Sequence, residues 1–263
     1  MCYSTMQTIL FHSTIFGPIH SRRLGTSLGV NLSPADGKVC SFDCLYCEAG
    51  FNAQGPGKAG MPPRAEVKRL LNDKLSQMKE AGEPLDVITV SGNGEPTMHP
   101  DFEGVIADTI ELRDKWFPGV KISVLSNSTR LDREGVERAL RRVDNNILKL
   151  DSALTPTLRL IDRPVAGSFT AEKAIEDISR FSGQCTVQTM LVTGSYDGHT
   201  VDNTTKEEIE ALLEAYKRIR PRDVMLYSID RKTPAEELRK VPREVLEQVA
   251  ERVRALGIPA TTV

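Results

Sequence analysis

Three cysteines share one short stretch of the chain and are spaced as the ligands of a metal cluster would be. Cys40, Cys44 and Cys47 form a C-x3-C-x2-C pattern. Thiolate is the usual protein ligand of iron–sulfur sites, and three thiolates on one loop can bind three irons of a four-iron cubane. The fourth iron then has no protein ligand, so a small molecule with an amine and a carboxylate can chelate it. The spacing therefore predicts a [4Fe–4S] cluster with one open coordination position.

A structural zinc site is the main alternative for such a loop. Zinc sites usually have four ligands, often as two separated pairs. Cys2 lies near the N-terminus, Cys185 opens a predicted buried strand, and the four histidines are scattered at positions 12, 20, 99 and 199. Because no fourth ligand stands out, zinc and three unrelated core cysteines are both weaker interpretations than the cluster.

A glycine-rich turn with an acidic residue follows the second predicted strand, which covers residues 86–91. The turn consists of Gly92, Asn93, Gly94 and Glu95. Glycines at a strand end let the backbone approach a ligand closely, and the Glu95 carboxylate can accept hydrogen bonds from an ammonium group. A plain turn with a surface glutamate is the alternative.

Polar side chains also follow the third and fourth predicted strands. Ser126 and Asn127 end the strand at 120–126, and Asp151 follows the strand at 146–150. Hydroxyl, amide and carboxylate groups at adjacent strand ends suit the hydrogen bonds of a ribose and a carboxylate. Helix capping uses the same residue types and is the alternative.

Gln188 is a further candidate, because it lies inside the apolar fifth strand predicted at 185–192. A buried amide needs hydrogen-bond partners. The side chain therefore either points into a polar barrel interior or is a satisfied amide of the core, and we favour the interior.

Alternating strand-like and helix-like stretches must position these residues. Strands are predicted at 28–32, 86–91, 120–126, 146–150, 185–192 and 223–229, and helices at 64–80, 102–115, 132–141, 171–181, 206–219 and 242–256. Six strand–helix units in series indicate parallel strands with right-handed crossovers. A closed barrel normally has eight, so we expect an α/β fold, an open partial (β/α)6 barrel with the cluster loop after the first strand. A doubly wound sheet is the alternative, and in both folds the site lies at the carboxyl ends of the strands.

Length and charge limit the class of protein. We expect a single domain over residues 1–263, with a core at about 17–258 and an N-terminal extension at 1–16. The net charge of −2 gives no overall field that attracts nucleic acid or an anionic membrane. No apolar run approaches the roughly 20 residues of a spanning helix, and the N-terminus lacks a signal peptide. We therefore expect a cytoplasmic protein without a membrane partner, whose reduced cysteines serve metal or redox chemistry.

In combination, these motifs resemble the radical S-adenosylmethionine (SAM) superfamily. A C-x3-C-x2-C pattern with an aromatic residue, Tyr46, just before the last cysteine is similar to the signature of that family. The resemblance implies a [4Fe–4S] cluster on Cys40, Cys44 and Cys47 that reductively cleaves SAM to a 5′-deoxyadenosyl radical, which abstracts hydrogen from an unidentified substrate. It also implies a low-potential electron donor, flavodoxin or ferredoxin.

The resemblance also assigns binding residues. The turn from Gly92 to Glu95 looks like the Gly-Gly-Glu motif that holds the SAM amino group, with Asn93 interrupting the glycines. Side chains at the strand ends look like the ribose and methionine-carboxylate contacts. The expected cofactor-binding set is Tyr46, Gly92, Asn93, Gly94, Glu95, Ser126, Asn127, Asp151 and Gln188.

Segments 17–31, 187–190 and 227–231 resemble a poorly characterised branch related to the wyosine-forming tRNA enzymes. The chain lacks their cysteines for a second cluster and any strongly basic character, so the tRNA function is a weaker interpretation. The same motifs also fit a glycyl-radical activase, a peptide- or metabolite-modifying enzyme and a non-catalytic iron–sulfur electron carrier. The sequence assigns no role to five further polar residues, Arg22, Arg23, Arg163, Tyr227 and Arg231.

Overall fold

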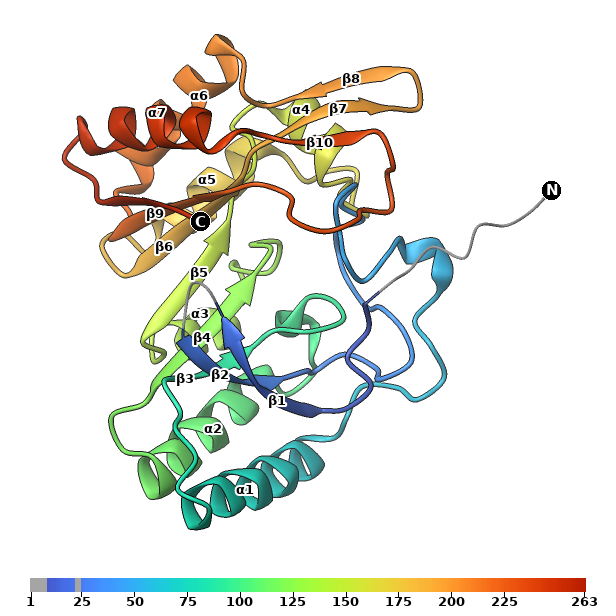
Figure 1. Cartoon of the computed structure of the whole chain (residues 1–263), viewed down its shortest axis with the longest axis vertical. Coiled ribbons are helices and arrows are strands. Elements are labelled where there is room, and N and C mark those ends of the chain that lie inside the picture. The colour runs from blue at the N-terminus through green and yellow to red at the C-terminus, as the bar shows by residue number, and fades with distance from the viewer. Residues whose placement is uncertain (1–8, 22–24) are drawn as a thin grey trace. The chain divides into compact units, whose positions relative to one another are not determined.

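The computed structural model describes residues 9–21 and 25–263, so Cys2, Arg22 and Arg23 lie outside the described residues (Figure 1). The chain divides into two compact units. The N-terminal unit consists of Phe11–Cys40 and Gly55–Leu148, and the C-terminal unit consists of residues 9–10, Ser41–Gln54 and Lys149–Val263. The cysteine loop therefore leaves the first unit after Cys40 and enters the second at Ser41.

The sheet of the N-terminal unit has strands in the order β1-β2-β3-β4-β5. Their bounds are Ile15–Ser21, Gly25–Val30, Val87–Val90, Lys121–Ser126 and Asn145–Lys149. β1 runs antiparallel to β2, and the others are parallel, with Leu28, Ile88 and Ile122 in register. The helices of this unit are α1 (Arg64–Glu80), α2 (Phe102–Trp116) and α3 (Glu134–Leu140), with the short 3-10 helix η2 (Pro96–Met98).

Apolar periodicity explains the helices of this unit. α1 buries Val67, Leu71, Leu75 and Met78, which recur every three or four residues on one face. α2 begins at Asp101, whose side chain accepts a hydrogen bond from the Gly104 N–H. The parallel strands of this unit thus end in loops that share one edge of the sheet.

The C-terminal unit contains a parallel set of strands, β6-β9-β11, and an antiparallel sheet, β10-β7-β8. The strands are β6 (Cys185–Met190), β7 (Val192–Tyr196), β8 (His199–Asp202), β9 (Asp223–Tyr227), β10 (Leu238–Lys240) and β11 (Ala260–Thr262). The helices are η1 (Asn52–Gln54), α4 (Thr155–Ile161), α5 (Ala171–Ser179), α6 (Lys206–Ile219) and α7 (Arg243–Arg254). Leu150, directly after β5, donates its N–H to the Gln188 carbonyl of β6.

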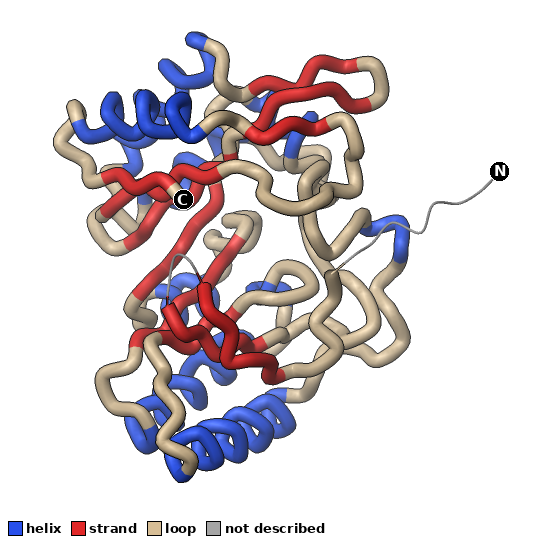
Figure 2. Tube along the Cα trace, in the orientation of Figure 1, coloured by secondary structure: helices blue, strands red, loops and turns tan. Residues whose placement is uncertain are grey.

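The predicted α/β fold with parallel strands is confirmed. The six predicted strands correspond to β2, β3, β4, β5, β6 and β9, and the six predicted helices correspond to α1, α2, α3, α5, α6 and α7. The segment between β2 and α1, residues 31–63, is loop apart from η1 (Figure 2). It carries the three cysteines after the first parallel strand, as predicted.

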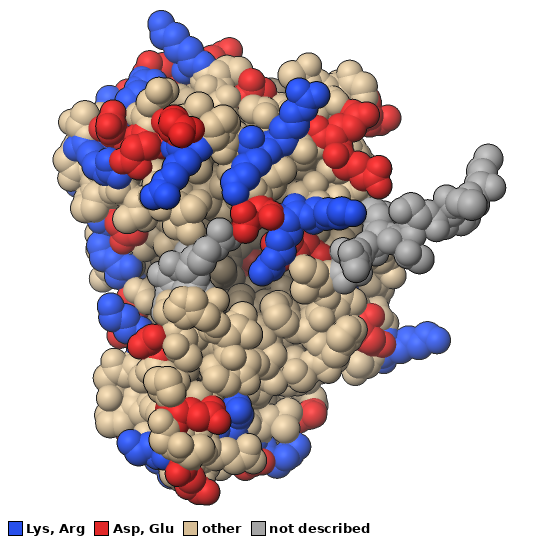
Figure 3. Space-filling view, in the orientation of Figure 1, with Lys and Arg blue, Asp and Glu red and all other residues tan. Residues whose placement is uncertain are grey.

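Acidic and basic side chains are interspersed on the face drawn in Figure 3, in keeping with the net charge of −2. Within the part of the chain that the structure describes, no helix has the length and apolar character needed to cross a bilayer.

Candidate functional site

In the N-terminal unit, the start of the cysteine loop pairs with the glycine-rich turn after β3. The Val39 N–H donates to the Asn93 carbonyl at 3.1 Å, and the Glu95 N–H donates to the Val39 carbonyl at 3.0 Å. Gly94 lies between them with φ 151°, and a Cβ there would be 1.9 Å from the Val39 carbonyl oxygen. Only glycine fits this approach, so Gly94 brings Cys40 against the end of β3.

Glu95 joins the ends of β3 and β4. It is buried, and its Oε1 accepts from the Thr97 N–H at 3.0 Å, the Thr97 hydroxyl at 2.5 Å and the Ser126 hydroxyl at 2.9 Å. Its Oε2 accepts from the Asn127 N–H at 2.6 Å. Burial raises the pKa of Glu95, although these hydrogen bonds act in the opposite direction. A carboxylate oxygen accepts more than one bond, so Oε2 can take a further donor.

Asn127 connects the end of β4 to the cysteine loop. Its Nδ2 donates to the Cys40 sulfur at 3.5 Å, while its Oδ1 accepts from the Thr129 N–H at 3.1 Å and hydroxyl at 2.7 Å. The Thr129 bonds fix the amide so that its donor faces the sulfur. The structure thus brings together four predicted site residues in one unit, Cys40, Glu95, Ser126 and Asn127.

Asn93 and Gly92 both contact the loop that precedes the cysteines. The Asn93 amide bonds to the Phe11 N–H at 2.8 Å and to the carbonyls of Phe11 at 2.9 Å and Pro34 at 3.0 Å. A Cβ on Gly92 would be 2.2 Å from Oδ1 of Asn31. These two residues pack the turn against the preceding loop, and the Asn93 amide is fully used by backbone groups.

Arg130, three residues after Asn127, lies within electrostatic range of Glu95 and is absent from the residues that the sequence predicts for the site. Its Nε is buried and has no hydrogen-bond partner among the described residues. Burial lowers the pKa of its guanidinium, and Arg133 adds to this, while Glu95 acts in the opposite direction. In the sequence, the only signal for Arg130 was a basic residue shortly after the predicted strand at 120–126.

In the C-terminal unit, Asp151 lies at the centre of a buried polar network. It is fully buried. Its Oδ1 accepts from the Met190 N–H at 2.9 Å, and its Oδ2 accepts from the Tyr46 hydroxyl and pairs with Lys149 Nζ at 2.8 Å. Both carboxylate oxygens are therefore bonded within the protein, and Asp151 links Tyr46 of the cysteine loop to the end of β5.

The same network reaches a cysteine. Lys149 Nζ pairs with Asp162 Oδ1 at 3.0 Å, and the Cys44 thiol donates to the same oxygen at 3.5 Å. Burial, with the nearby Asp151, raises the pKa of Asp162 to about 8 despite Lys149. Burial would lower the pKa of Lys149, but Asp151, Asp162 and Cys44 outweigh it and raise it well above its ordinary value.

The remaining cysteines differ in their surroundings. The Cys47 N–H donates to the Cys44 carbonyl at 3.2 Å, and the half-buried Cys47 carbonyl accepts from the Gly50 N–H at 2.8 Å. Cys185 is fully buried on β6, and burial raises the pKa of its thiol to about 12. Gln188, also on β6, donates to the Met225 sulfur at 3.6 Å and faces the same side as Met190.

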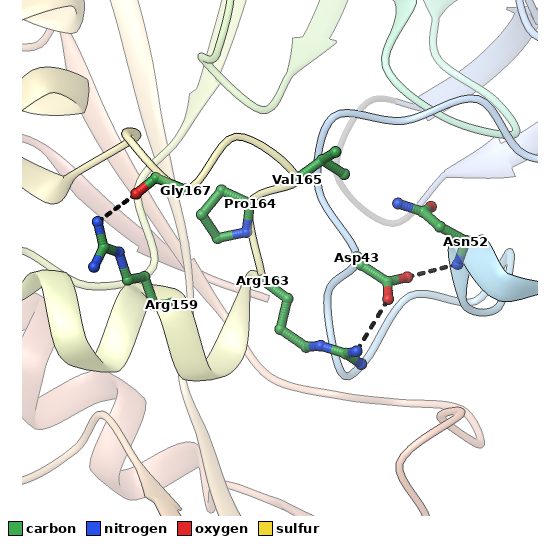
Figure 4. Close-up of a pocket in the computed structure, with 7 residues that line it drawn as sticks. All are labelled: Asp43, Asn52, Arg159, Arg163, Pro164, Val165 and Gly167. Carbon is green, nitrogen blue, oxygen red and sulfur yellow. Dashed lines mark hydrogen bonds and ion pairs between the residues drawn. The ribbon is translucent and has the colours of Figure 1, made fainter.

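A hollow of about 510 Å³ adjoins the cysteine loop within the C-terminal unit (Figure 4). Arg163 points toward Asp43, with which it pairs at 3.3 Å, whereas Arg159 points away and donates to the Gly167 carbonyl at 2.6 Å. The Arg163 guanidinium also stacks over the rings of Phe51 and Tyr196, at 5.0 and 5.3 Å from their centroids. Arg163 therefore holds the cysteine loop.

Two other residues without a sequence-based role have partners at the surface or in the backbone. Arg231 pairs with Glu48, the residue after Cys47, at 2.5 Å. The Tyr227 carbonyl accepts the Leu191 N–H at 2.8 Å, which continues the pairing of β6 and β9. Neither contact by itself indicates a ligand.

Comparison with known proteins identifies relatives. Residues 36–203 match the family model described as "Radical SAM superfamily". The chain is 31% identical over 221 residues to a "UPF0026 protein" of Helicobacter pylori, covering 82% of this chain and 66% of the relative. It thus spans slightly less than two thirds of that protein's length.

Solved structures that share the fold include two enzymes. A radical SAM methyltransferase from Sphaerobacter thermophilus superimposes with a TM-score of 0.65 at 17% identity, over 90% of this chain and 65% of the other. A structure of TYW1 with a bound lysine–pyruvate adduct gives 0.60 at 16% identity, over 89% and 75%. Likeness at this level of identity shows the fold alone.

Proposed function

We propose that this protein is a SAM-cleaving enzyme, because the chain belongs to the radical SAM superfamily. In the proposal, Cys40, Cys44 and Cys47 hold a [4Fe–4S] cluster. When bound, the cluster supplies the electron that cleaves SAM to a 5′-deoxyadenosyl radical, which takes hydrogen from a substrate. The observation that carries the proposal is the hydrogen bond of Asn127 to Cys40 beside the buried Glu95.

The donor set suits a cubane. Among residues 9–21 and 25–263, no three His, Cys, Asp or Glu side chains form a site for a single metal ion. A cubane takes one thiolate on each of three irons, so its ligands need not converge on one point. The Asn127 amide, which donates to the Cys40 sulfur, would stabilise that sulfur as a thiolate.

Groups of opposite charge are available for the amino acid end of SAM. Glu95 Oε2 can accept from the ammonium, and the unused Nε–H of Arg130 can donate to the carboxylate. Ser126 and Asn127 are tied to Glu95 and hold it in place. In the proposal, Asp151 acts through Tyr46, whose hydroxyl it accepts, and Gln188 stays a predicted contact.

Anaerobic reconstitution tests the proposal. Purified protein is loaded with iron and sulfide, mixed with SAM and dithionite, and assayed for 5′-deoxyadenosine by mass spectrometry. Wild type should bind about four irons and release 5′-deoxyadenosine, and Cys44→Ala should release none. Cys185→Ala is the matched control, because this thiol is buried outside the motif, and it should behave as wild type.

The remaining outcomes decide between function classes. Iron without 5′-deoxyadenosine would favour a non-catalytic electron carrier, and zinc or no metal would overturn the proposal. If 5′-deoxyadenosine forms, flavodoxin and ferredoxin can replace dithionite to test the expected electron donor. Capture of RNA against capture of protein by the loaded enzyme would then separate a tRNA substrate from a glycyl-radical enzyme or peptide.

A further inference from the structure

A buried lysine lies beside the cysteine loop without an assigned role. Lys149 is the last residue of β5, and its side chain is only 13% exposed. Its Nζ is 2.8 Å from Asp151 Oδ2, 3.0 Å from Asp162 Oδ1 and 4.3 Å from the centre of the Tyr46 ring. Burial of an ammonium group is costly unless it is paired, so the two carboxyl groups and the ring account for its presence.

Each partner of Lys149 is in turn bonded to the cysteine loop. Asp151 accepts the Tyr46 hydroxyl, and Asp162 accepts the Cys44 thiol at 3.5 Å. The backbone follows the same path, since the Asp43 N–H donates to the Asp162 carbonyl at 3.0 Å and the Leu45 N–H to the Ile161 carbonyl at 2.9 Å. The ammonium group of Lys149 is thus linked to the cysteine loop through two carboxyl groups, one that bonds to Cys44 and one that bonds to Tyr46.

Cluster binding would change the charge on the Cys44 sulfur beside Asp162. A cysteine that ligates iron is a thiolate and can no longer donate to Asp162. The sulfur then adds negative charge next to Asp162 and Asp151. A positive charge in low dielectric beside these groups offsets that charge strongly, and Lys149 lies on both carboxylates.

We propose that Lys149 is a positioning residue of the cluster site, which fixes the Cys44–Tyr46 segment and raises the reduction potential of the bound cluster. This inference rests on the proposed function. The reduced cluster carries one more negative charge than the oxidised one, so a nearby cation favours reduction. Net charge and hydrogen bonds around the ligands are established determinants of cluster potential.

Potentiometric titration followed by electron paramagnetic resonance tests this inference. The variants are Lys149→Met, which keeps an unbranched chain and removes the ammonium group, and Lys149→Arg, which keeps the charge. Lys173→Met is the matched control, because Lys173 also pairs with a buried aspartate, Asp177, at 2.8 Å, but its own side chain on α5 is 43% exposed. Iron content and circular dichroism are measured for each loaded protein, in the absence of SAM.

We expect Lys149→Met to titrate at a more negative potential than wild type, with Lys149→Arg and Lys173→Met close to wild type. Equal potentials for wild type and a fully loaded Lys149→Met would overturn the inference, as would an equal shift in Lys149→Arg. If Lys149→Met fails to hold iron, rescue of loading by Lys149→Arg supports the need for charge, and failure of both overturns it. A wild-type protein that binds no cluster would instead refute the proposed function.

Discussion

At the scale of single residues, the glycine at position 94 controls how closely the cysteine loop can approach β3. We predict that Gly94→Ala lowers both stability and iron uptake, because its Cβ would overlap the Val39 carbonyl at 1.9 Å. Backbone strain of this kind costs roughly 1–3 kcal/mol before the overlap is counted. Urea unfolding and iron content after reconstitution measure the two effects.

Gly60→Ala is the control for this prediction. Gly60 also has a positive φ, 72°, but a Cβ there meets nothing within 4 Å. It therefore reports the cost of a positive φ in the absence of any overlap. Equal losses in the two variants would show that the approach to Val39 has no importance for the loop.

Glu95 gives a second prediction at this scale. In Glu95→Gln, an amide nitrogen replaces one acceptor oxygen and faces a donor, so we expect a loss of about 1–3 kcal/mol in the free energy of unfolding near pH 7. Burial raises the pKa of Glu95 above its ordinary value of 4.5. As the pH rises above 4.5, the Glu95 carboxyl group therefore loses its proton in the unfolded chain before it does so in the folded protein. The contribution of Glu95 to stability therefore falls as pH rises through this window.

The variant does not titrate, so its stability should fall less than that of wild type between pH 5 and pH 7. Chemical unfolding of the apo-protein at several pH values measures the difference. Glu103→Gln removes a carboxylate that pairs with Arg138 at 2.8 Å and should change stability little, since solvent screens ion pairs at the surface. Parallel pH curves for wild type and Glu95→Gln would contradict the assignment.

At the scale of elements, a short segment after α4 holds the cysteine loop. Residues 161–165 accept or donate backbone hydrogen bonds with Ser41, Asp43 and Leu45. Arg163, held at φ 48°, adds the ion pair to Asp43 and the stacks on two aromatic rings. We predict that Arg163→Ala speeds amide hydrogen exchange at Asp43 and Leu45 by several-fold, because residues 161–165 then hold the cysteine loop by backbone hydrogen bonds alone.

Arg159→Ala is the matched variant, because Arg159 lines the same hollow but bonds only to the Gly167 carbonyl among the described residues. Its exchange rates at Asp43 and Leu45 should match those of wild type. Hydrogen–deuterium exchange with mass spectrometry on peptides that cover residues 41–47 measures both. Unchanged exchange in Arg163→Ala would remove Arg163 from the positioning of the loop.

The elements that the sequence predicted correctly are those with long hydrophobic periods, such as α1 and α6, and buried apolar strands, such as β3 and β4. The missed elements are short or belong to hairpins: β1, β7, β8, β10, β11 and α4. One signal was readable, since Asp197 and Gly198 both have positive φ, 50° and 76°, in the turn between β7 and β8. Asp-Gly is the typical sequence of such a two-residue hairpin turn.

The site was only partly predictable, for a different reason. Spacing along the chain is enough to predict the cysteines as ligands, because that pattern is local in sequence. The partners of Asn93 lie 59 and 82 residues away, and Tyr46 meets Asp151 across 105 residues. Such pairings depend on the fold, so the packing role of Asn93 and the participation of Lys149 and Asp162 could not be read from spacing.

At the scale of the whole molecule, cluster binding should appear as stability. A group that binds only the folded chain stabilises it by mass action, by about 2.7 kcal/mol at 100 times its dissociation constant. One kcal/mol shifts the melting temperature of a domain of this size by about 2–4 °C, so we predict that removing the cluster with a chelator and an oxidant lowers the melting temperature by at least about 5 °C. Differential scanning calorimetry of the loaded and stripped protein, kept anaerobic, measures it.

Two variants make this effect specific to the motif. Cys44→Ala should melt at the same temperature with and without iron and sulfide, because it lacks a ligand. Cys185→Ala, which removes a buried thiol of β6, should keep the full difference between loaded and stripped protein even if both melt lower than wild type. If the loaded wild-type protein contains iron but melts at the same temperature as the stripped protein, the unfolded chain holds the metal as well as the folded chain does. The cysteine loop would then not owe its affinity to the contacts with β3, β4 and residues 161–165 described above.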